Sequence, residues 1–165
     1  MTEDMLRQAL DRMPVGYALH KIIIDDEGSP CDYEYVEANR AFEEATGLVA
    51  AEIVGKRVTE VIPNIKSDEF DWISKYSEVA LKGQTLDFEQ HSSSLNKIFK
   101  VNAFSPKVGF FITLVNDVTK ENETNRKLVR ELGNQKELQS ALTRDAIFTT
   151  QIGRASCRER VSNYV

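Results

Sequence analysis

Residues 39–48 read NRAFEEATGL and contain both ends of a short predicted helix. Asn39 is a favourable N-cap, because its side chain can accept a hydrogen bond from the first helical turn. Gly47 can adopt the left-handed backbone conformation that ends many helices. Phe42 and Ala45 fall on one side of this helix, so that side is expected to face a hydrophobic core.

Predicted strands flank this segment on both sides. Residues 15–25 are rich in β-branched and aromatic side chains, residues 31–38 alternate tyrosines with acidic residues, and DDEGSP (25–30) between them predicts a hairpin turn. The run 110–115 is continuously apolar, which is typical of a strand buried on both faces. Two further strands are predicted before it, at residues 86–89 and 99–103. Strands and helices that occur in separate runs indicate an α+β fold with an antiparallel sheet.

Further helices are predicted around the central segment. Residues 3–13 carry apolar side chains at helical spacing, and residues 50–61 predict a short helix interrupted near Gly55. Residues 68–82 predict a longer helix, with Ser67 as its N-cap and an acidic first turn that suits the helix dipole.

The C-terminal part of the sequence is highly charged and helical in pattern. Residues 120–144 predict a linker helix with a weak heptad seam, in which Leu128, Leu132 and Leu142 alternate with polar residues and Gly133 lowers helix stability by about 1 kcal/mol. Asn125, Gln135 and Gln139 supply the polar positions of this seam.

The end of the sequence is interpreted separately. Residues 145–151 could begin a further domain, but are too few to establish one. Residues 152–165 contain IGRASCRERV, which resembles the translated read-through of a sequencing adapter. This tail is therefore interpreted as artefactual and expected to pack against nothing, with a natural basic tail as the alternative.

The segment 39–48, the motif EIVGK at 52–56 and the tripeptide Asp117-Val118-Thr119 together resemble the PAS domain family. The resemblance covers about residues 14–119. It implies a five-stranded antiparallel sheet with short helices on one face, here joined to an N-terminal helix (1–13) and the C-terminal linker helix. It also implies a small internal pocket and a signal relayed through that linker. Family members bind haem, flavin or small metabolites, or bind nothing.

Four residues are candidates for a ligand pocket. Trp72, Ile73 and Tyr76 lie on the predicted helix that should cover the pocket, and Phe42 lies on the short helix before it. The alternative for each is ordinary core packing, because a pocket and a core share residues in a domain of this size.

No cofactor or metal is expected. The helix 68–82 has no histidine for haem, and the cysteine motif of flavin photoreceptors is absent. His20 and His91 are interpreted as satisfied structural or surface imidazoles, and Cys31 as an inert thiol. The acidic residues 25–27 do not follow a calcium-loop spacing and are interpreted as a solvated turn.

Composition excludes several classes of function. The formal net charge of −5 argues against nucleic-acid binding, and no apolar run is long enough to cross a membrane. No catalytic constellation is recognisable, so the chain is not expected to be an enzyme. The expected location is cytoplasmic.

The predicted function is that of a sensory and dimerising input module from a truncated bacterial signalling protein, of the histidine kinase or diguanylate cyclase type. It would bind an unknown small molecule or partner and form a homodimer through the linker and the N-terminal helix. The alternative is a ligand-silent module that only pairs with another PAS domain.

Overall fold

The computed structural model describes the backbone of residues 2–162 and the side-chain surroundings of residues 2–146. The elements follow in the order α1 (Glu3–Asp11), β1 (Gly16–Ile24), β2 (Pro30–Ala38), α2 (Arg40–Thr46), α3 (Ala50–Ile53), α4 (Val58–Val61), the 3₁₀ turn η1 (Ile65–Ser67), α5 (Trp72–Lys82), β3 (Leu86–Ser92), β4 (Lys97–Phe104), β5 (Phe110–Asp117) and α6 (Thr119–Ser162). The chain divides into two compact units, with the boundary after Lys120.

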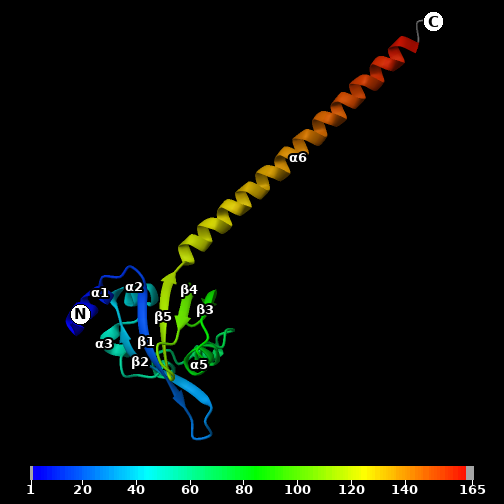
Figure 1. Ribbon diagram of the computed structural model, residues 1–165. Helices are drawn as coiled ribbons and strands as arrows, with labels where there is room; N and C mark the ends of the chain where they lie inside the picture. Colours follow the sequence, from blue (N-terminus) through cyan, green and yellow to red (C-terminus); the bar gives the residue numbers. More distant parts are fainter. Residues whose placement is uncertain (1, 163–165) are drawn as a thin grey trace. The chain divides into compact units, whose positions relative to one another are not determined.

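The five strands form one antiparallel sheet in the order β2-β1-β5-β4-β3. The first and last strands in sequence, β1 and β5, are therefore neighbours in the middle of the sheet (Figure 1). The chain crosses from one edge strand, β2, to the other, β3, through the segment that contains α2 to α5. This arrangement confirms the predicted α+β fold with an antiparallel sheet.

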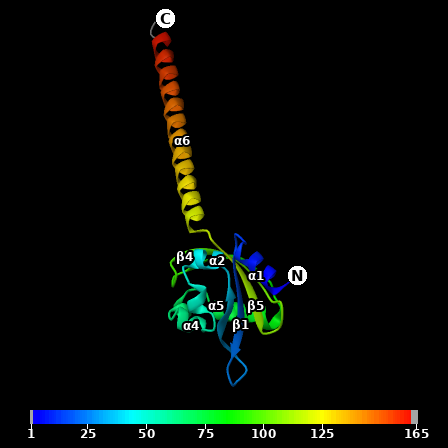
Figure 2. The same ribbon diagram turned by 90° about the vertical axis from the view of Figure 1, so that its left-hand side faces the viewer.

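Helices α2 and α5 pack on the same face of the sheet. His20 on β1 pairs in register with Tyr35 on β2 and with Phe111 on β5, so these three side chains share a face. The ring of Phe42 on α2 lies 6.2 Å from that of Tyr35, and the ring of Tyr76 on α5 stacks on Phe111 at 4.9 Å. Figure 2 shows these helices beside the sheet from a second direction.

The side chain of Asn39 joins three segments of the chain. Its Oδ1 accepts hydrogen bonds from the backbone N–H of Phe42 at 2.9 Å, as predicted for an N-cap, and of Tyr17 at 2.8 Å. Its Nδ2 donates to the backbone carbonyls of Leu10 at 2.8 Å and Val15 at 3.1 Å. Asn39 is only 2% exposed, and it uses both ends of its amide to fix α1, the start of β1 and α2 together.

Gly16 marks the closest approach between the sheet and α2. A Cβ atom at this position would lie 2.8 Å from the carbonyl oxygen of Val115 and 2.9 Å from the Cα of Phe42. Both neighbours are backbone atoms that cannot rotate away. The start of β1 therefore passes between β5 and α2 with no room for a side chain.

Two predictions about local structure are wrong. Strand β5 alternates fully buried and half-buried residues, so it is not buried equally on both faces. Helix α5 begins at Trp72, and its N-cap is Asp71, whose side chain accepts from the N–H of Ser74 at 3.0 Å. Ser67 instead ends η1, because the chain turns at residues 68–71 before the helix starts.

Helix α6 is longer than the predicted linker of residues 120–144. It runs from Thr119 to Ser162 and so includes the segment 145–151. The side chains of the predicted artefactual tail, 152–165, lie outside the described residues. Among the described residues of α6, the apolar side chains are exposed: Leu128, Val129, Leu132, Leu138 and Leu142. Within residues 2–162, no helix combines the length and apolar character needed to cross a membrane.

We expect Asn39→Ala to lower the free energy of unfolding by about 3 kcal/mol. The substitution removes a helix cap and the side-chain hydrogen bonds to the backbone of Tyr17, Leu10 and Val15. Urea unfolding followed by circular dichroism measures the change. The matched control is Asn64→Ala, because Asn64 precedes η1 but makes no side-chain cap. A loss for Asn39→Ala no larger than about 0.5 kcal/mol, the usual range for surface changes, would contradict this role.

Candidate functional site

A cavity of about 60 Å³ lies between the inner face of the sheet and helices α2 and α5. All five strands contribute to its walls, together with the two helices. A cavity needs about 10–15 Å³ on this measure to hold one water molecule, so this space can hold several. Its aromatic side chains are those of His20, Tyr33, Tyr35, Phe42, Trp72, Tyr76 and Phe99.

His20 is the most unusual residue of the cavity wall. It is 2% exposed, and its ring stacks on Phe111 with the ring centroids 4.5 Å apart. Its Nε2 forms a 3.0 Å hydrogen bond with the hydroxyl of Thr113, but its Nδ1 is buried without a hydrogen-bond partner. Burial lowers the pKa of His20 to about 3, which keeps the imidazole neutral at neutral pH.

The interpretation of His20 as a satisfied or surface imidazole is therefore wrong. The side chain is buried, and one of its two nitrogens is unsatisfied. His91, in contrast, is exposed at the end of β3, as a surface imidazole would be.

Three tyrosines give the cavity further polar atoms. Burial raises the pKa of Tyr33, Tyr35 and Tyr76 above the usual tyrosine value, so all three hydroxyls stay protonated. The rings of Tyr33 and Tyr35 lie 5.8 Å apart in an edge-on arrangement. The ring of Tyr33 lies edge-on to those of His20 and Tyr76, at 5.2 and 5.8 Å. These contacts make the wall aromatic and uncharged.

The structure brings three of the four predicted pocket residues to this cavity. Phe42, Trp72 and Tyr76 line it, and their contact with a ligand stays a prediction. Ile73 does not line it, because its position on α5 turns it toward a separate surface depression beside Pro30. Several residues that sequence analysis missed lie on strands, among them His20, Tyr33, Tyr35 and Thr113, and Thr46 was missed on α2. The alternation of tyrosines with acidic residues at 31–38 was the available signal for Tyr33 and Tyr35.

Asp68 forms hydrogen bonds with two residues of the cavity wall, Trp72 and Ser92. Its carboxylate accepts hydrogen bonds from Trp72 Nε1 at 2.9 Å, from the Ser92 hydroxyl at 2.9 Å, and from the N–H and hydroxyl of Ser94 at 2.8 and 2.6 Å. Partial burial alone would raise the pKa of Asp68, but these hydrogen bonds outweigh it and hold the pKa below its usual value. The interpretation of Asp68 as part of the first turn of a helix is wrong, because α5 begins only at Trp72.

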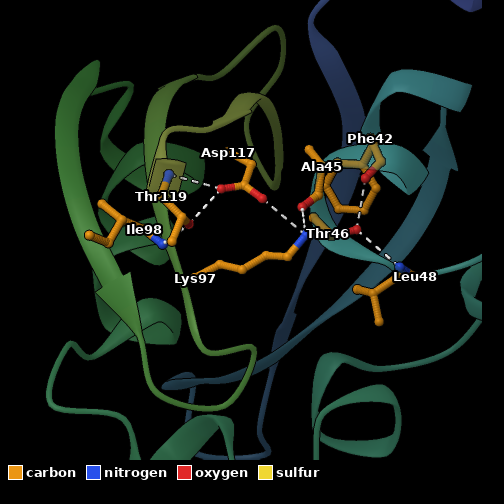
Figure 3. A network of polar contacts seen from close by, with 8 residues as sticks. All are labelled: Phe42, Ala45, Thr46, Leu48, Lys97, Ile98, Asp117 and Thr119. Carbon is orange, nitrogen blue, oxygen red and sulfur yellow. Dashed lines mark hydrogen bonds and ion pairs between the residues drawn. The ribbon is translucent and has the colours of Figure 1, made fainter. Parts of the chain in front are cut away.

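A second polar network connects α2 with the end of the sheet (Figure 3). Lys97 Nζ donates to the backbone carbonyl of Ala45 at 2.7 Å and forms a 3.0 Å ion pair with Asp117. The carboxylate of Asp117 also accepts from the N–H and hydroxyl of Thr119, at 3.0 and 2.6 Å. The Thr119 hydroxyl accepts in turn from the N–H of Ile98 at 2.9 Å.

This network links the cavity wall to the first residue of α6. Thr46 lines the cavity beside Ala45, and its hydroxyl donates to the carbonyl of Phe42 at 2.8 Å. Partial burial would raise the pKa of Asp117, but hydrogen bonds from Thr119 and the charge and hydrogen bond of Lys97 lower it below the usual value. Asp117 is therefore ionised at neutral pH and available to pair with Lys97.

Other candidate groups are structural. Asp25 Oδ1 accepts from the N–H of Glu27 at 3.0 Å and of Ser29 at 2.8 Å, so it closes the predicted hairpin turn. Cys31 is half-buried, and its thiol contacts the carbonyl of Ile23 at 3.6 Å. The described part of the chain contains no group of three or more His, Cys, Asp or Glu residues placed to hold a metal ion.

Comparison with known proteins agrees with this architecture. The PAS domain family model matches residues 4–79. An RNA-binding Light-Oxygen-Voltage receptor of known structure is 20% identical, with a TM-score of 0.52, over 81% of this chain and 37% of that chain. The chain thus spans little more than a third of this receptor. No curated protein sequence matches significantly.

Two further solved structures show lower similarity. A domain of a sensory box sensor histidine kinase/response regulator from Geobacter sulfurreducens is 16% identical, over 69% of this chain and 92% of that one, with a TM-score of 0.47. A blue-light activated histidine kinase from Erythrobacter litoralis is 17% identical, over 68% of this chain and 36% of that one, with a TM-score of 0.44.

The fold is of the α+β class and is built on a five-stranded antiparallel sheet. Residues 4–79 match the PAS domain family model, and the similarity to the receptor structure shows a shared fold. Domains of this family are generally not catalytic.

We expect acid to destabilise the wild-type protein more than the His20→Gln variant. The pKa of His20 is about 3 in the folded protein, below the ordinary value of 6.5, so the unfolded chain binds the proton more tightly. The contribution of His20 is complete above about pH 6.5 and decreases as the pH falls. Between pH 7 and pH 5 the wild type should lose about 2 kcal/mol more than His20→Gln.

Urea unfolding at several pH values measures this difference. His91→Gln is the matched control, because the chain has only two histidines and His91 is exposed. It should follow the wild-type pH dependence. Equal pH dependence of His20→Gln and the wild type would show that His20 titrates normally in the folded state.

Proposed function

We propose that this chain is the sensory input module of a larger bacterial signalling protein, of the histidine kinase or diguanylate cyclase type. A small molecule binds in the internal cavity, and the resulting change reaches α6, which leads toward the output domain. The observation that carries this proposal is the chain of polar contacts from the cavity wall to Thr119. The family match and the solved relatives in sensor kinases are consistent with it.

The relay begins at α2. Phe42 and Thr46 line the cavity, so an occupant that displaces them also moves the C-terminal turn of α2. That turn presents the carbonyl of Ala45 to Lys97. Lys97 Nζ contacts both the carbonyl of Ala45 and the carboxylate of Asp117. A movement of one of these groups therefore changes the geometry of the contact with the other.

The relay ends at the junction of β5 and α6. Lys97 and Thr119 both contact the carboxylate of Asp117. The backbone of Ile98 is hydrogen-bonded to Val118 and Thr119, the two residues after Asp117. The N–H of Ile98 donates to the Thr119 hydroxyl, and its carbonyl accepts from the N–H of Val118 at 2.9 Å. A shift of Lys97 therefore changes the bonds that set the first turn of α6. A ligand can produce such a shift if the two positions of Lys97 differ only slightly in free energy.

Homodimerisation is the second part of the proposal. Along α6, Leu128, Leu132 and Leu142 occupy heptad positions and are exposed by more than half. Gln135 and Gln139 occupy the intervening core positions and weaken the seam. A weak parallel pairing of this kind suits a switch, because two registers then differ by only a few kcal/mol.

A ligand-silent pairing module is the alternative function. The exposed apolar residues of α6 and the exposed Met5 and Leu6 of α1 favour it, because they offer surface for a second copy without requiring a ligand. Native mass spectrometry separates the two functions. A small molecule retained by the protein supports sensing, and an empty dimer supports pairing alone.

We expect Lys97→Met to uncouple the cavity from α6. In the wild-type background, Thr46→Val should change hydrogen-exchange protection of the Val118 and Thr119 amides by about threefold or more, because it alters the cavity end of the relay. In the Lys97→Met background, the same substitution should have no effect on these amides.

The control for this cycle is Lys100→Met, an exposed lysine on the same strand. Thr46→Val should act in the Lys100→Met background as it does in the wild type. If its effect on Val118 and Thr119 persists in the Lys97→Met background, Lys97 does not carry the coupling.

The double substitution Leu128→Asp, Leu132→Asp should weaken dimerisation of the full chain at least about tenfold, because it places charges in the heptad seam. Sedimentation velocity at several concentrations measures the dissociation constant. The matched control, Asn134→Asp with Ser140→Asp, adds the same charge to the exposed helix outside the seam. If all three proteins give one dissociation constant, α6 is not the dimer interface.

A further inference from the structure

The cavity contains one buried polar atom whose need for a partner is unmet. Within the described part of the chain, one buried side-chain nitrogen or oxygen atom has no hydrogen-bond partner, and this atom is Nδ1 of His20. Leaving a buried donor or acceptor unpaired costs about 1–3 kcal/mol. Rings surround the imidazole on several sides, with Phe111 stacked at 4.5 Å and Tyr35 at 5.1 Å. None of these rings supplies a bond to Nδ1, and His20 lines the cavity.

The hydrogen bond to Thr113 leaves two possibilities for this atom. If Nε2 accepts from the Thr113 hydroxyl, Nδ1 carries the proton and needs an acceptor. If Nε2 donates, Nδ1 needs a donor. A ligand that carries both a donor and an acceptor satisfies His20 in either case.

The charge of the lining restricts the ligand further. Among the described residues that line the cavity, none is Asp, Glu, Lys or Arg. The ionisable ones are His20 and three tyrosines, all neutral at neutral pH. An ion would lose its hydration here and gain no opposite charge, so a charged ligand is strongly disfavoured.

The volume restricts its size. A space of about 60 Å³ corresponds to about four or five water-sized units. It is well below the roughly 300–1,000 Å³ of sites that hold drug-sized ligands. The cavity as it stands therefore suits a ligand of about four or five non-hydrogen atoms.

We propose that the cavity binds a small neutral molecule of the amide or alcohol class, which forms a hydrogen bond with Nδ1 of His20 and packs against the aromatic wall. His20 is then the residue that selects for neutral hydrogen-bonding ligands. This inference rests on the proposed sensory function and gives its ligand a chemical class.

Acetamide and acetate form a matched pair of probes. They have the same shape and size, and acetate differs by its negative charge. Trp72 is the single tryptophan of the chain and lines the cavity, so its fluorescence reports occupancy. For a ligand of four non-hydrogen atoms, the tightest attainable Kd is about 40 µM, so the titration extends into the millimolar range.

We expect acetamide to change Trp72 fluorescence in a saturable way, and acetate to bind at least about tenfold more weakly. ¹⁵N spectra of histidine-labelled protein should show that acetamide shifts Nδ1 of His20 but leaves the signals of His91 unchanged. This measurement needs no substitution. His20→Phe should weaken acetamide binding by about tenfold or more, because it keeps the ring but removes the nitrogen.

The outcomes separate this inference from the proposed function. If acetate binds as tightly as acetamide, or if His20 Nδ1 does not respond to bound acetamide, the proposed ligand class is wrong but the cavity still binds a small molecule. If neither probe binds, the proposed ligand class is overturned, whereas the ligand-sensing function fails only if native mass spectrometry also finds an empty protein. If acetamide binds but Thr46→Val has no effect on α6, only the relay fails.

Discussion

The amide of Asn39 is the constraint on which the rest of the domain depends. It satisfies two N–H donors and two carbonyl acceptors from segments far apart in sequence. These four bonds set where β1 begins and at what angle α2 leaves β2. The position of α2 then decides where Phe42 and Thr46 meet the sheet, and so where the cavity wall lies. A buried amide of this kind favours full pairing, because an unpaired polar group costs more in a buried environment than at the surface.

The same packing provides both the stability of the domain and its candidate site. Phe111 of β5 is fully buried and contacts His20 and Tyr76, which belong to the sheet and to α5. Such aromatic contacts stabilise the fold by about 0.5–1.5 kcal/mol each beyond area burial. His20 lowers this stability because its Nδ1 stays unpaired. Unsatisfied polar atoms in a folded protein are rare enough to suggest a function, and here the residue that carries the atom lines the cavity.

Local sequence patterns predicted the elements well, because capping and alternation depend on near neighbours. Asn39 and Gly47 delimit α2 as expected, and all five strands were located. Contacts between distant segments could not be predicted in this way. Nothing near Lys97 in the sequence indicates that its side chain reaches Ala45 and Asp117. The register that sets His20 beside Tyr35 and Phe111 likewise depends on pairing across the sheet. The start of α5 was misplaced because Ser67 and Asp71 are both good caps, and tertiary contacts of Asp68 favour the later one.

Gly16 determines which sequences can adopt this fold. Even alanine would bring its methyl group into the backbone of β5 and α2, so a library built on this scaffold can vary the surface of the sheet but must keep residue 16 fixed. Enlarging the cavity for a bigger ligand by moving α2 away from the sheet would relax this restriction. A change in ligand size and a change at residue 16 are thus expected to arise together in engineered variants.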